Sequence, residues 1–283
     1  MYPAGEAGIA VRRVAFREGV TLRVLEAGPA NAPLTAVLLH GWAGSVYSFA
    51  ETTPALASAG YRVVAIDLPG HGLSDKPWDP SYYTLPAMAD AVSSAIAGVG
   101  VRRHVIVTHS MAGTFALELA RRGGADLCGL VLSSSVGVGR ATLAPLARLL
   151  TPDVAAGVLS RLVTRGLVRF VLGHAFTTAG RPTEHDVDQY WAPSQFAGFV
   201  PALLHCLHQM NWNTNADALR GLTLPAMVIA GGRDRVVHGA ARAGELIAGA
   251  RVLIVPDGGH LVMQECAATV NPEIVAFLHA LRR

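Results

Sequence analysis

Short apolar runs rich in β-branched residues recur along this chain and alternate with segments of helical periodicity. Runs without alternating polar positions are typical of strands buried on both faces of a parallel sheet. Such runs cover residues 36–40, 61–67, 104–109, 129–133, 226–230 and 251–255, and residues 11–17 and 20–26 flank a Glu18–Gly19 turn as an edge hairpin. The alternation predicts an α/β fold with a mostly parallel, doubly wound sheet.

The clearest predicted helix is the C-terminal one. Asn271 can act as its N-cap, and Pro272 suits its first turn. The apolar residues that recur at helical spacing are Val270, Ile274, Phe277, Leu278 and Leu281. We therefore expect a helix that is capped by Asn271.

The alternation stops between Ser135 and Leu222. No run in this interval predicts a strand, and its helical patterns are punctuated by prolines. An insert of this kind is expected to form a helical cap, or lid, that packs over the sheet. We therefore predict a core made of residues 1–135 and 223–283, with a helical cap at residues 136–222 inserted after the sixth strand.

Composition excludes several classes of protein. Hydrophobic residues make up 51% of the chain and charged residues 15%, so a large core can form and disorder is excluded. The formal charge is only +3, and the basic residues do not form the stripe of a nucleic-acid interface. No apolar stretch of about 18 residues predicts a membrane span, and residues 1–13 lack the apolar segment of a secretory signal. We expect a cytoplasmic protein with no nucleic-acid partner.

The cysteines and histidines do not indicate a metal site. Cys128, Cys206 and Cys266 are far apart and lack CxxC spacing, so neither a disulfide framework nor a zinc site follows. Four histidines of the cap have no carboxylate or cysteine that completes a ligand set: His174, His185, His205 and His208. We expect a protein that uses no metal and no cofactor.

Ser110 lies where an apolar strand, residues 104–109, runs directly into a helical pattern. A serine at such a strand-to-helix turn presents its hydroxyl above the carboxyl edge of the sheet, provided that its neighbours are small. Serine can also act simply as the N-cap of the helix that follows. The turn makes Ser110 a candidate nucleophile, and the residues that could activate it must be sought downstream.

An acid and a base follow two later strands. Asp234 comes after the strand at 226–230, and His260 comes after the strand at 251–255. A serine hydroxyl is a weak nucleophile until a base accepts its proton, and the base is held in turn by a carboxylate. The chain order Ser, Asp, His is one of the orders in which such a triad occurs on a strand-to-helix turn. Asp257 is a rival acid, but it lies in the histidine's own loop, and we prefer Asp234.

Acyl transfer also needs hydrogen-bond donors for a developing oxyanion. The strand at 36–40 ends in His40 and Gly41, where the backbone can turn its amides inward. We nominate the main-chain N–H groups of Trp42 and Met111 as the oxyanion hole.

Taken together, these motifs resemble those of the α/β-hydrolase fold superfamily over essentially the whole chain. The segments that carry the resemblance are residues 40–42, 67–74, 108–113, 232–234 and 259–260, followed by Glu265 and Asn271. The resemblance implies the roles already argued for Ser110, Asp234 and His260, and for the N–H groups of Trp42 and Met111.

The sequence departs from the family's pattern at three positions. The family usually has glycine two residues before and two residues after the nucleophile, where this chain has Thr108 and Ala112. A β-branched threonine crowds the turn. Relatives that cleave C–C bonds commonly have tryptophan after the histidine, whereas this chain has Leu261. Haloalkane dehalogenases and epoxide hydrolases of the family use an aspartate nucleophile, and Ser110 argues against both activities.

Large apolar residues are frequent in the predicted cap, and a pocket between cap and sheet is the default ligand site. We nominate Trp191, Phe196 and Trp212 as substrate-binding residues, although each can equally belong to the packing of the cap. Arg161, Arg165 and Arg169 repeat every four residues, which resembles a basic face that rests on membranes. We interpret this face as solvated and expect no membrane contact.

The sequence therefore predicts a cofactor-independent serine hydrolase, of the carboxylesterase type, that cleaves an apolar ester or related acyl compound through an acyl-enzyme. Two alternatives stay open. The same scaffold can serve as a C–C hydrolase or perhydrolase, and it can serve as a slow-turnover ligand-binding or signalling protein that retains the triad. The expected partner is a small-molecule substrate, and the expected state is a monomer or homodimer.

Overall fold

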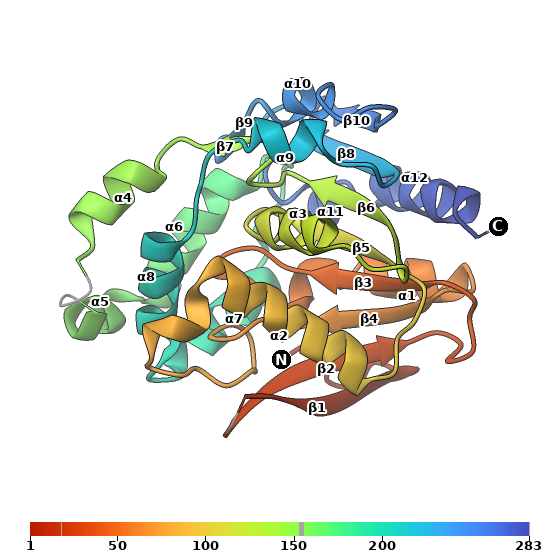
Figure 1. Ribbon diagram of the computed structural model, residues 1–283. Helices are drawn as coiled ribbons and strands as arrows, with labels where there is room; N and C mark the ends of the chain where they lie inside the picture. The colour runs from red at the N-terminus through yellow and green to blue at the C-terminus, as the bar shows by residue number, and fades with distance from the viewer. Residues whose placement is uncertain (18, 153–155, 283) are drawn as a thin grey trace.

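The computed structural model describes residues 1–17, 19–152 and 156–282, and an eight-stranded sheet runs through it (Figure 1). The strand order is β1-β2-β4-β3-β5-β6-β8-β10. The strands are β1 (Ile9–Arg17), β2 (Val20–Ala27), β3 (Thr35–Leu39), β4 (Arg62–Ile66), β5 (His104–His109), β6 (Leu127–Ser133), β8 (Ala226–Gly231) and β10 (Arg251–Val255). All pairings from β4 to β10 are parallel, and only β1 and β2 run antiparallel to their neighbours. The predicted α/β class and mostly parallel sheet are confirmed.

Each predicted strand lies within two residues of an observed one, and the hairpin of β1 and β2 forms the expected sheet edge. Residue 18 of its predicted turn lies outside the described residues. Strands β3 to β6 and β8 are almost entirely buried, because helices cover both faces of the sheet.

Two apolar clusters fill the space on the two sides of the sheet. Val37 on β3 faces the cluster that contains Phe115, whereas the next residue, Leu38, faces the cluster that contains Ile274. Successive side chains of a strand point to opposite faces, so one buried strand feeds both clusters. The helices outside the predicted cap are α1 (Thr52–Ser58), α2 (Leu85–Gly98), α3 (Ala112–Arg122), α10 (Ala240–Gly244), α11 (Val262–Glu265) and α12 (Ala267–Ala280), with 3-10 turns η1 (Val46–Phe49) and η2 (Pro80–Tyr83).

The predicted start of the C-terminal helix is wrong. Helix α12 begins at Ala267, and Pro272 lies inside it. Asn271 does not cap the helix, because its side chain accepts from the Thr52 hydroxyl at 3.0 Å and donates to the Glu51 carbonyl at 3.0 Å. These bonds tie α12 to the start of α1.

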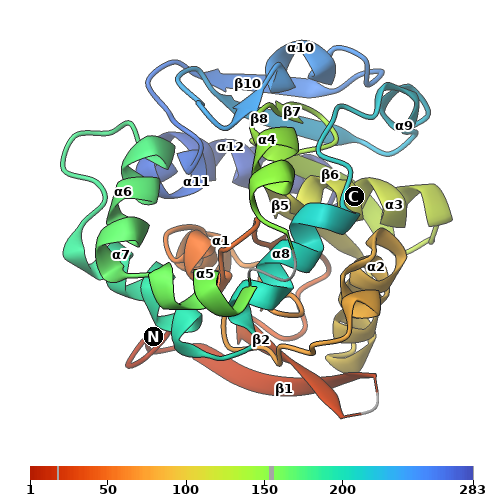
Figure 2. The same ribbon diagram turned by 90° about the vertical axis from the view of Figure 1, so that its left-hand side faces the viewer.

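Residues 136–222, the predicted cap, hold a chain of helices between β6 and β8 (Figure 2). They are α4 (Ala144–Leu150), α5 (Ala156–Leu162), α6 (Arg165–Ala175), α7 (Glu184–Trp191), η4 (Ala192–Gln195), α8 (Phe199–Gln209) and α9 (Ala216–Arg220). The interval also holds a strand that the sequence did not predict, β7 (Arg140–Ala141), which pairs with β9 (Val237–His238). Two residues are too few to give a periodic pattern.

Several contacts attach these helices to the core. The Trp42 indole donates to the Leu203 carbonyl of α8 at 2.9 Å, and the Tyr47 hydroxyl donates to the Asp186 carboxylate at 2.8 Å. The Tyr190 hydroxyl donates to the Gln264 side chain at 2.6 Å. Among the described residues, no helix is long and apolar enough to span a bilayer.

Candidate active site

Ser110 lies between the end of β5 and the start of α3, in a strained backbone conformation. Its φ is +55°, a left-handed value that few residues other than glycine adopt. Close approach of the chain on both sides fixes this turn. A Cβ on Gly41 would stand 2.7 Å from the Ser110 Cβ, and a Cβ on Gly113 would stand 2.5 Å from the Ser135 Cβ. Only glycine fits at these two positions.

Thr108, which the family pattern would have as glycine, is accommodated by hydrogen bonds to β6 and the loop that follows it. Its hydroxyl donates to the Val131 carbonyl at 3.1 Å and lies 2.9 Å from the Ser135 hydroxyl. The threonine is therefore used as a cross-link between neighbouring segments. At Ala112, the other position where the family usually has glycine, the side chain is fully buried in the apolar cluster that contains Phe115.

The structure brings Ser110, His260 and Asp234 together. The His260 Nε2 lies 3.0 Å from the Ser110 Oγ, and the His260 Nδ1 lies 3.0 Å from an Asp234 carboxylate oxygen. A carboxylate only accepts, so Nδ1–H donates to Asp234 and Nε2 is left to accept the serine proton. Asp257, the rival acid, is 80% exposed and pairs with Arg233 instead.

Asp234 is kept ionised in a largely buried place. Burial by itself raises the pKa of the carboxyl, but His260 and the N–H groups of Val237 and Val236 outweigh it and lower the pKa to about 2. The carboxylate is therefore charged at neutral pH and can stabilise an imidazolium at His260.

The loop after β3 crosses the top of the turn that carries Ser110, as the contact of Gly41 shows. Within the described part of the chain, the main-chain N–H groups of Trp42 and Met111 donate no hydrogen bond. Both are therefore available to an oxygen held beside the serine.

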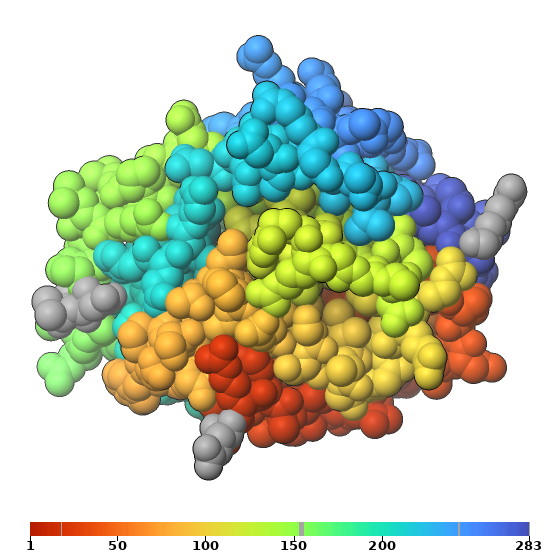
Figure 3. All heavy atoms as spheres, viewed as in Figure 1, coloured from red at the N-terminus to blue at the C-terminus, as the bar shows by residue number. Residues whose placement is uncertain are grey.

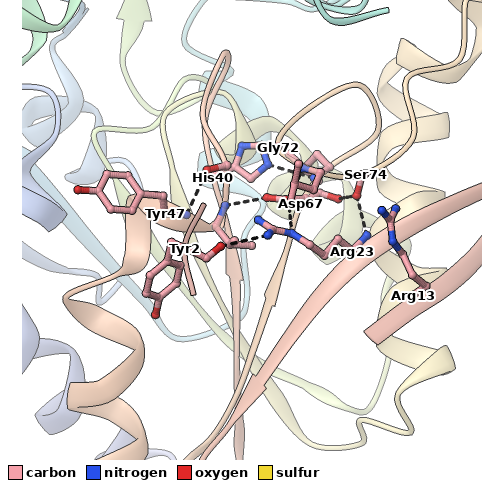
Figure 4. A network of polar contacts seen from close by, with 12 residues as sticks. Tyr2, Arg13, Arg23, His40, Tyr47, Asp67, Gly72 and Ser74 are labelled. Carbon is pink, nitrogen blue, oxygen red and sulfur yellow. Dashed lines mark hydrogen bonds and ion pairs between the residues drawn. The ribbon is translucent and has the colours of Figure 1, made fainter. Parts of the chain in front are cut away.

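A buried ion pair lies beneath this loop (Figure 4). The Asp67 carboxylate accepts from the Arg23 Nε at 2.7 Å, from the Val46 N–H at 2.8 Å and from the Leu73 N–H at 2.7 Å. Both charged side chains are buried. The pair therefore links β2 to the loops that follow β3 and β4.

His40 completes this support. Its Nε2 accepts from the Leu68 N–H at 3.0 Å, so the ring proton lies on Nδ1, which donates to the Gly41 carbonyl at 2.8 Å. Burial lowers the pKa of His40, which keeps the ring neutral in this role.

His109 is a contributor that the sequence analysis missed. Its Nε2 donates to the main-chain carbonyl of His260 at 2.9 Å, and the two rings lie 4.8 Å apart between centroids. Burial, followed by the neighbouring His260, lowers the pKa of His109 to about 3, so the ring is neutral. Its place directly before Ser110 was the available signal, but strand pattern alone gave no reason for an imidazole there.

Glu265 anchors the loop that carries His260. One carboxylate oxygen accepts from the Gly259 N–H at 2.7 Å, and the other accepts from the N–H groups of Thr177 and Thr178 at 2.9 and 3.0 Å. The His260 N–H itself donates to the Ala175 carbonyl at the end of α6. The base is therefore held from both the core and the cap.

The three proposed substrate-binding residues lie in different environments. Trp212 is buried in the main core cluster, and its indole donates to the Leu207 carbonyl at 2.9 Å. Phe196 is half exposed, with the Lys76 ammonium 4.8 Å from its ring centre. Trp191 ends α7, and its indole N–H is buried without a hydrogen-bond partner among the described residues.

Comparison with known proteins points to one family. A model of the alpha/beta hydrolase fold matches residues 37–265. The chain is 28% identical to epoxide hydrolase A of Mycobacterium tuberculosis, over 97% of this chain and 99% of that one. It is 30% identical to the magnesium-chelatase 30 kDa subunit of Rhodobacter capsulatus, over 90% of each. It is 29% identical to the dihydrolipoyllysine-residue acetyltransferase component of the acetoin cleaving system of Pseudomonas putida, over 89% of this chain, but it spans only 64% of that protein.

Solved structures share the fold. A serine hydrolase involved in carbazole degradation superposes with a TM-score of 0.80 at 21% identity, over 96% of this chain and 99% of that one. An esterase from Exiguobacterium antarcticum superposes with a TM-score of 0.78 at 19% identity, over 95% of this chain and 100% of that one.

The buried pair under the site yields a stability prediction. Replacing Arg23 by Met leaves the Asp67 charge buried without its cation, and we expect a loss of about 3 kcal/mol or more of unfolding free energy. Urea unfolding followed by tryptophan fluorescence measures this loss. Arg12→Met is the control, because Arg12 pairs with Glu26 on the exposed side of β1 and should cost about 1 kcal/mol or less. Equal losses in the two variants would contradict the role given to the pair.

Proposed function

The chain belongs to the alpha/beta hydrolase fold family, a family of hydrolases, and from this premise we propose that it is a serine hydrolase acting on carboxylic esters with an apolar moiety. One observation carries the proposal: the hydrogen-bonded chain from Ser110 through His260 to the ionised Asp234. Such a chain is what a hydroxyl needs to become a nucleophile at neutral pH.

The proposed reaction proceeds in two halves. Ser110 Oγ attacks the ester carbonyl carbon while His260 Nε2 takes the hydroxyl proton. The carbonyl oxygen becomes an oxyanion and accepts from the N–H groups of Trp42 and Met111. Collapse of this intermediate breaks the C–O bond, and His260 gives its proton to the departing alcohol. Water then attacks the acyl-enzyme with His260 as base, which releases the acid and restores Ser110.

Every proton in this scheme moves between groups of the chain, the substrate and water. The proposal therefore needs no cofactor and no metal.

The epoxide hydrolase among the relatives poses the main question about the chemistry. Opening an epoxide by the family's aspartate nucleophile requires a carboxylate where this chain has the Ser110 hydroxyl.

The position after the base, where C–C hydrolases commonly have tryptophan, is Leu261, which is buried in a small apolar cluster with Leu172 and Phe176. The alternatives to ester hydrolysis are C–C hydrolysis, perhydrolysis, and a slow-turnover ligand-binding or signalling role that retains the triad; turnover assays separate them.

The first test removes the nucleophile. Ser110→Ala should lower kcat for p-nitrophenyl esters by about 10⁴-fold or more, because members of a triad act as a unit. Ser134→Ala is the matched control. Ser134 is also buried at a positive φ, and its hydroxyl has no hydrogen-bond partner among the described residues, so its loss should leave kcat nearly unchanged.

A fluorophosphonate should label wild-type Ser110, as mass spectrometry of the digested protein would show. Near wild-type turnover in Ser110→Ala would contradict the mechanism. A single burst of product followed by negligible turnover would favour the ligand-binding alternative.

The second test separates the two candidate acids. Asp234→Asn should lower kcat by about 10⁴-fold, because an amide can hold His260 in the wrong tautomer. Asp257→Asn should have little effect, because that side chain is exposed and paired with Arg233. The measurement is kcat on one ester for both variants, and a larger loss in Asp257→Asn would refute the assignment.

The third test concerns the substrate pocket. We propose that Trp191 contributes to it, whereas Trp212 packs in the core. One methylene in such a pocket is worth about 1 to 3 kcal/mol, so Trp191→Ala should change kcat/KM for a butyrate and an octanoate ester by different factors. Trp212→Ala should lower Tm and reduce both values by a common factor. An unchanged butyrate-to-octanoate ratio in Trp191→Ala would exclude that residue from the pocket.

A further inference from the structure

Helices α4, α5 and α6 expose an unusual amount of apolar surface. Nine of the fourteen exposed large apolar side chains among the described residues belong to these helices or the residue before them, so the exposure is concentrated and not scattered. The nine residues, which we call the cap patch, are Leu143, Leu146, Leu149, Leu150, Val158, Leu162, Leu167, Phe170 and Val171. Concentrated apolar exposure marks a surface that contacts something else.

Helices α5 and α6 already pack on neighbouring elements through other side chains, so the cap patch is a second apolar face. Leu159 and Val163 of the α5 region pack on α8, and Val168 of α6 packs against Leu172 and Val187. The same helices present Leu162 and Phe170 outward, at 56% and 66% exposure. They are therefore apolar on two sides, whereas a helix at a water-exposed surface is normally polar on its outer side.

The charges around the cap patch favour one kind of partner. Residues 136–183 contain six arginines and one acidic residue, and two of these arginines, Arg165 and Arg169, pair with Glu184 and Asp188 just beyond. Arg161 and Arg169 are exposed directly beside Leu162 and Phe170. Arginine beside leucine and phenylalanine is the composition of helices that lie in the headgroup region of anionic membranes. A second copy of this chain would oppose the same positive charge and is disfavoured for that reason.

Helices α4 and α5 lie at the left edge of the molecule in Figures 1 and 3 and face the viewer in Figure 2. Helix α6 also connects the patch to the site, because the Ala175 carbonyl at its end accepts from the His260 N–H at 2.8 Å.

We propose that the cap patch docks this protein on the surface of anionic lipid bilayers, with its leucines and Phe170 in the headgroup region and Arg161 and Arg169 against lipid phosphates. The proposal departs from the expectation of a solvated face without membrane contact. The sequence showed the repeat of arginines, but it did not show that apolar side chains beside them face outward. Docking does not depend on the reaction at Ser110. It gives an apolar substrate dissolved in the bilayer a short path to the cap.

Cosedimentation with vesicles tests the proposal. Wild-type protein should sediment with vesicles of equal parts phosphatidylcholine and phosphatidylglycerol, and binding should weaken with added salt. It should bind much less to phosphatidylcholine alone. Arg161→Gln with Arg169→Gln should weaken binding by at least about tenfold, since each surface arginine is worth about 1 kcal/mol. Glu184 keeps Arg165 as its partner in that variant.

The apolar part of the patch has its own variant and control. Leu149→Ser with Phe170→Ser should weaken binding to the anionic vesicles by at least about tenfold, because the apolar contact with the bilayer is lost. Trp78→Ser removes a side chain of similar exposure, 65%, outside the patch and should bind as wild type. Circular dichroism and Tm confirm that each variant is folded.

Three outcomes would overturn the proposal. They are failure of the wild type to bind anionic vesicles, equal loss in Trp78→Ser, and a dimer in solution that dissociates on Leu149→Ser with Phe170→Ser while no vesicle binding occurs. The last outcome would assign the patch to contact between copies of the chain.

Discussion

The site depends on how closely three backbone segments approach one another at the carboxyl end of β5. Gly41 lies against Ser110 and Gly113 lies against Ser135, at distances that no side chain allows. The φ of +55° at Ser110 is maintained only because these neighbours fix the turn. Gly41 directly precedes Trp42 and Ser110 directly precedes Met111, so the two N–H groups nominated for the oxyanion hole follow the residues that meet at this turn.

Around this turn, each reactive group is held by partners buried below it. The Arg23–Asp67 pair and His40 hold the loop that carries Trp42, while Glu265 and His109 hold the loop that carries His260. Buried charges and imidazoles are costly unless they are hydrogen-bonded, and these groups all have partners. The position of the reactive groups therefore depends on the folding of the core beneath them.

The cap contributes on both of its sides. On its inner side, Asp186 and Tyr190 bond to the core, and the Ala175 carbonyl accepts from the His260 N–H. On its outer side, the cap patch presents leucines and Phe170 to the surroundings. A proposed hydrolase of apolar esters that also docks on lipid surfaces would meet substrates where they concentrate. The two proposals rest on different residues and are separable by experiment.

The sequence by itself determined the α/β class, the strands and the ends of the strands at which Ser110, Asp234 and His260 lie, because buried parallel strands leave a strong apolar pattern bounded by turn residues. It did not reveal the Asn271 link to α1, the His109 bond to His260 or the two-residue β7. These depend on partners more than sixty residues away, which no local pattern encodes. Tertiary structure also decided that Trp212 packs in the core and that the leucines of α4 to α6 face outward, since periodicity shows that a helix has an apolar face but not what that face contacts.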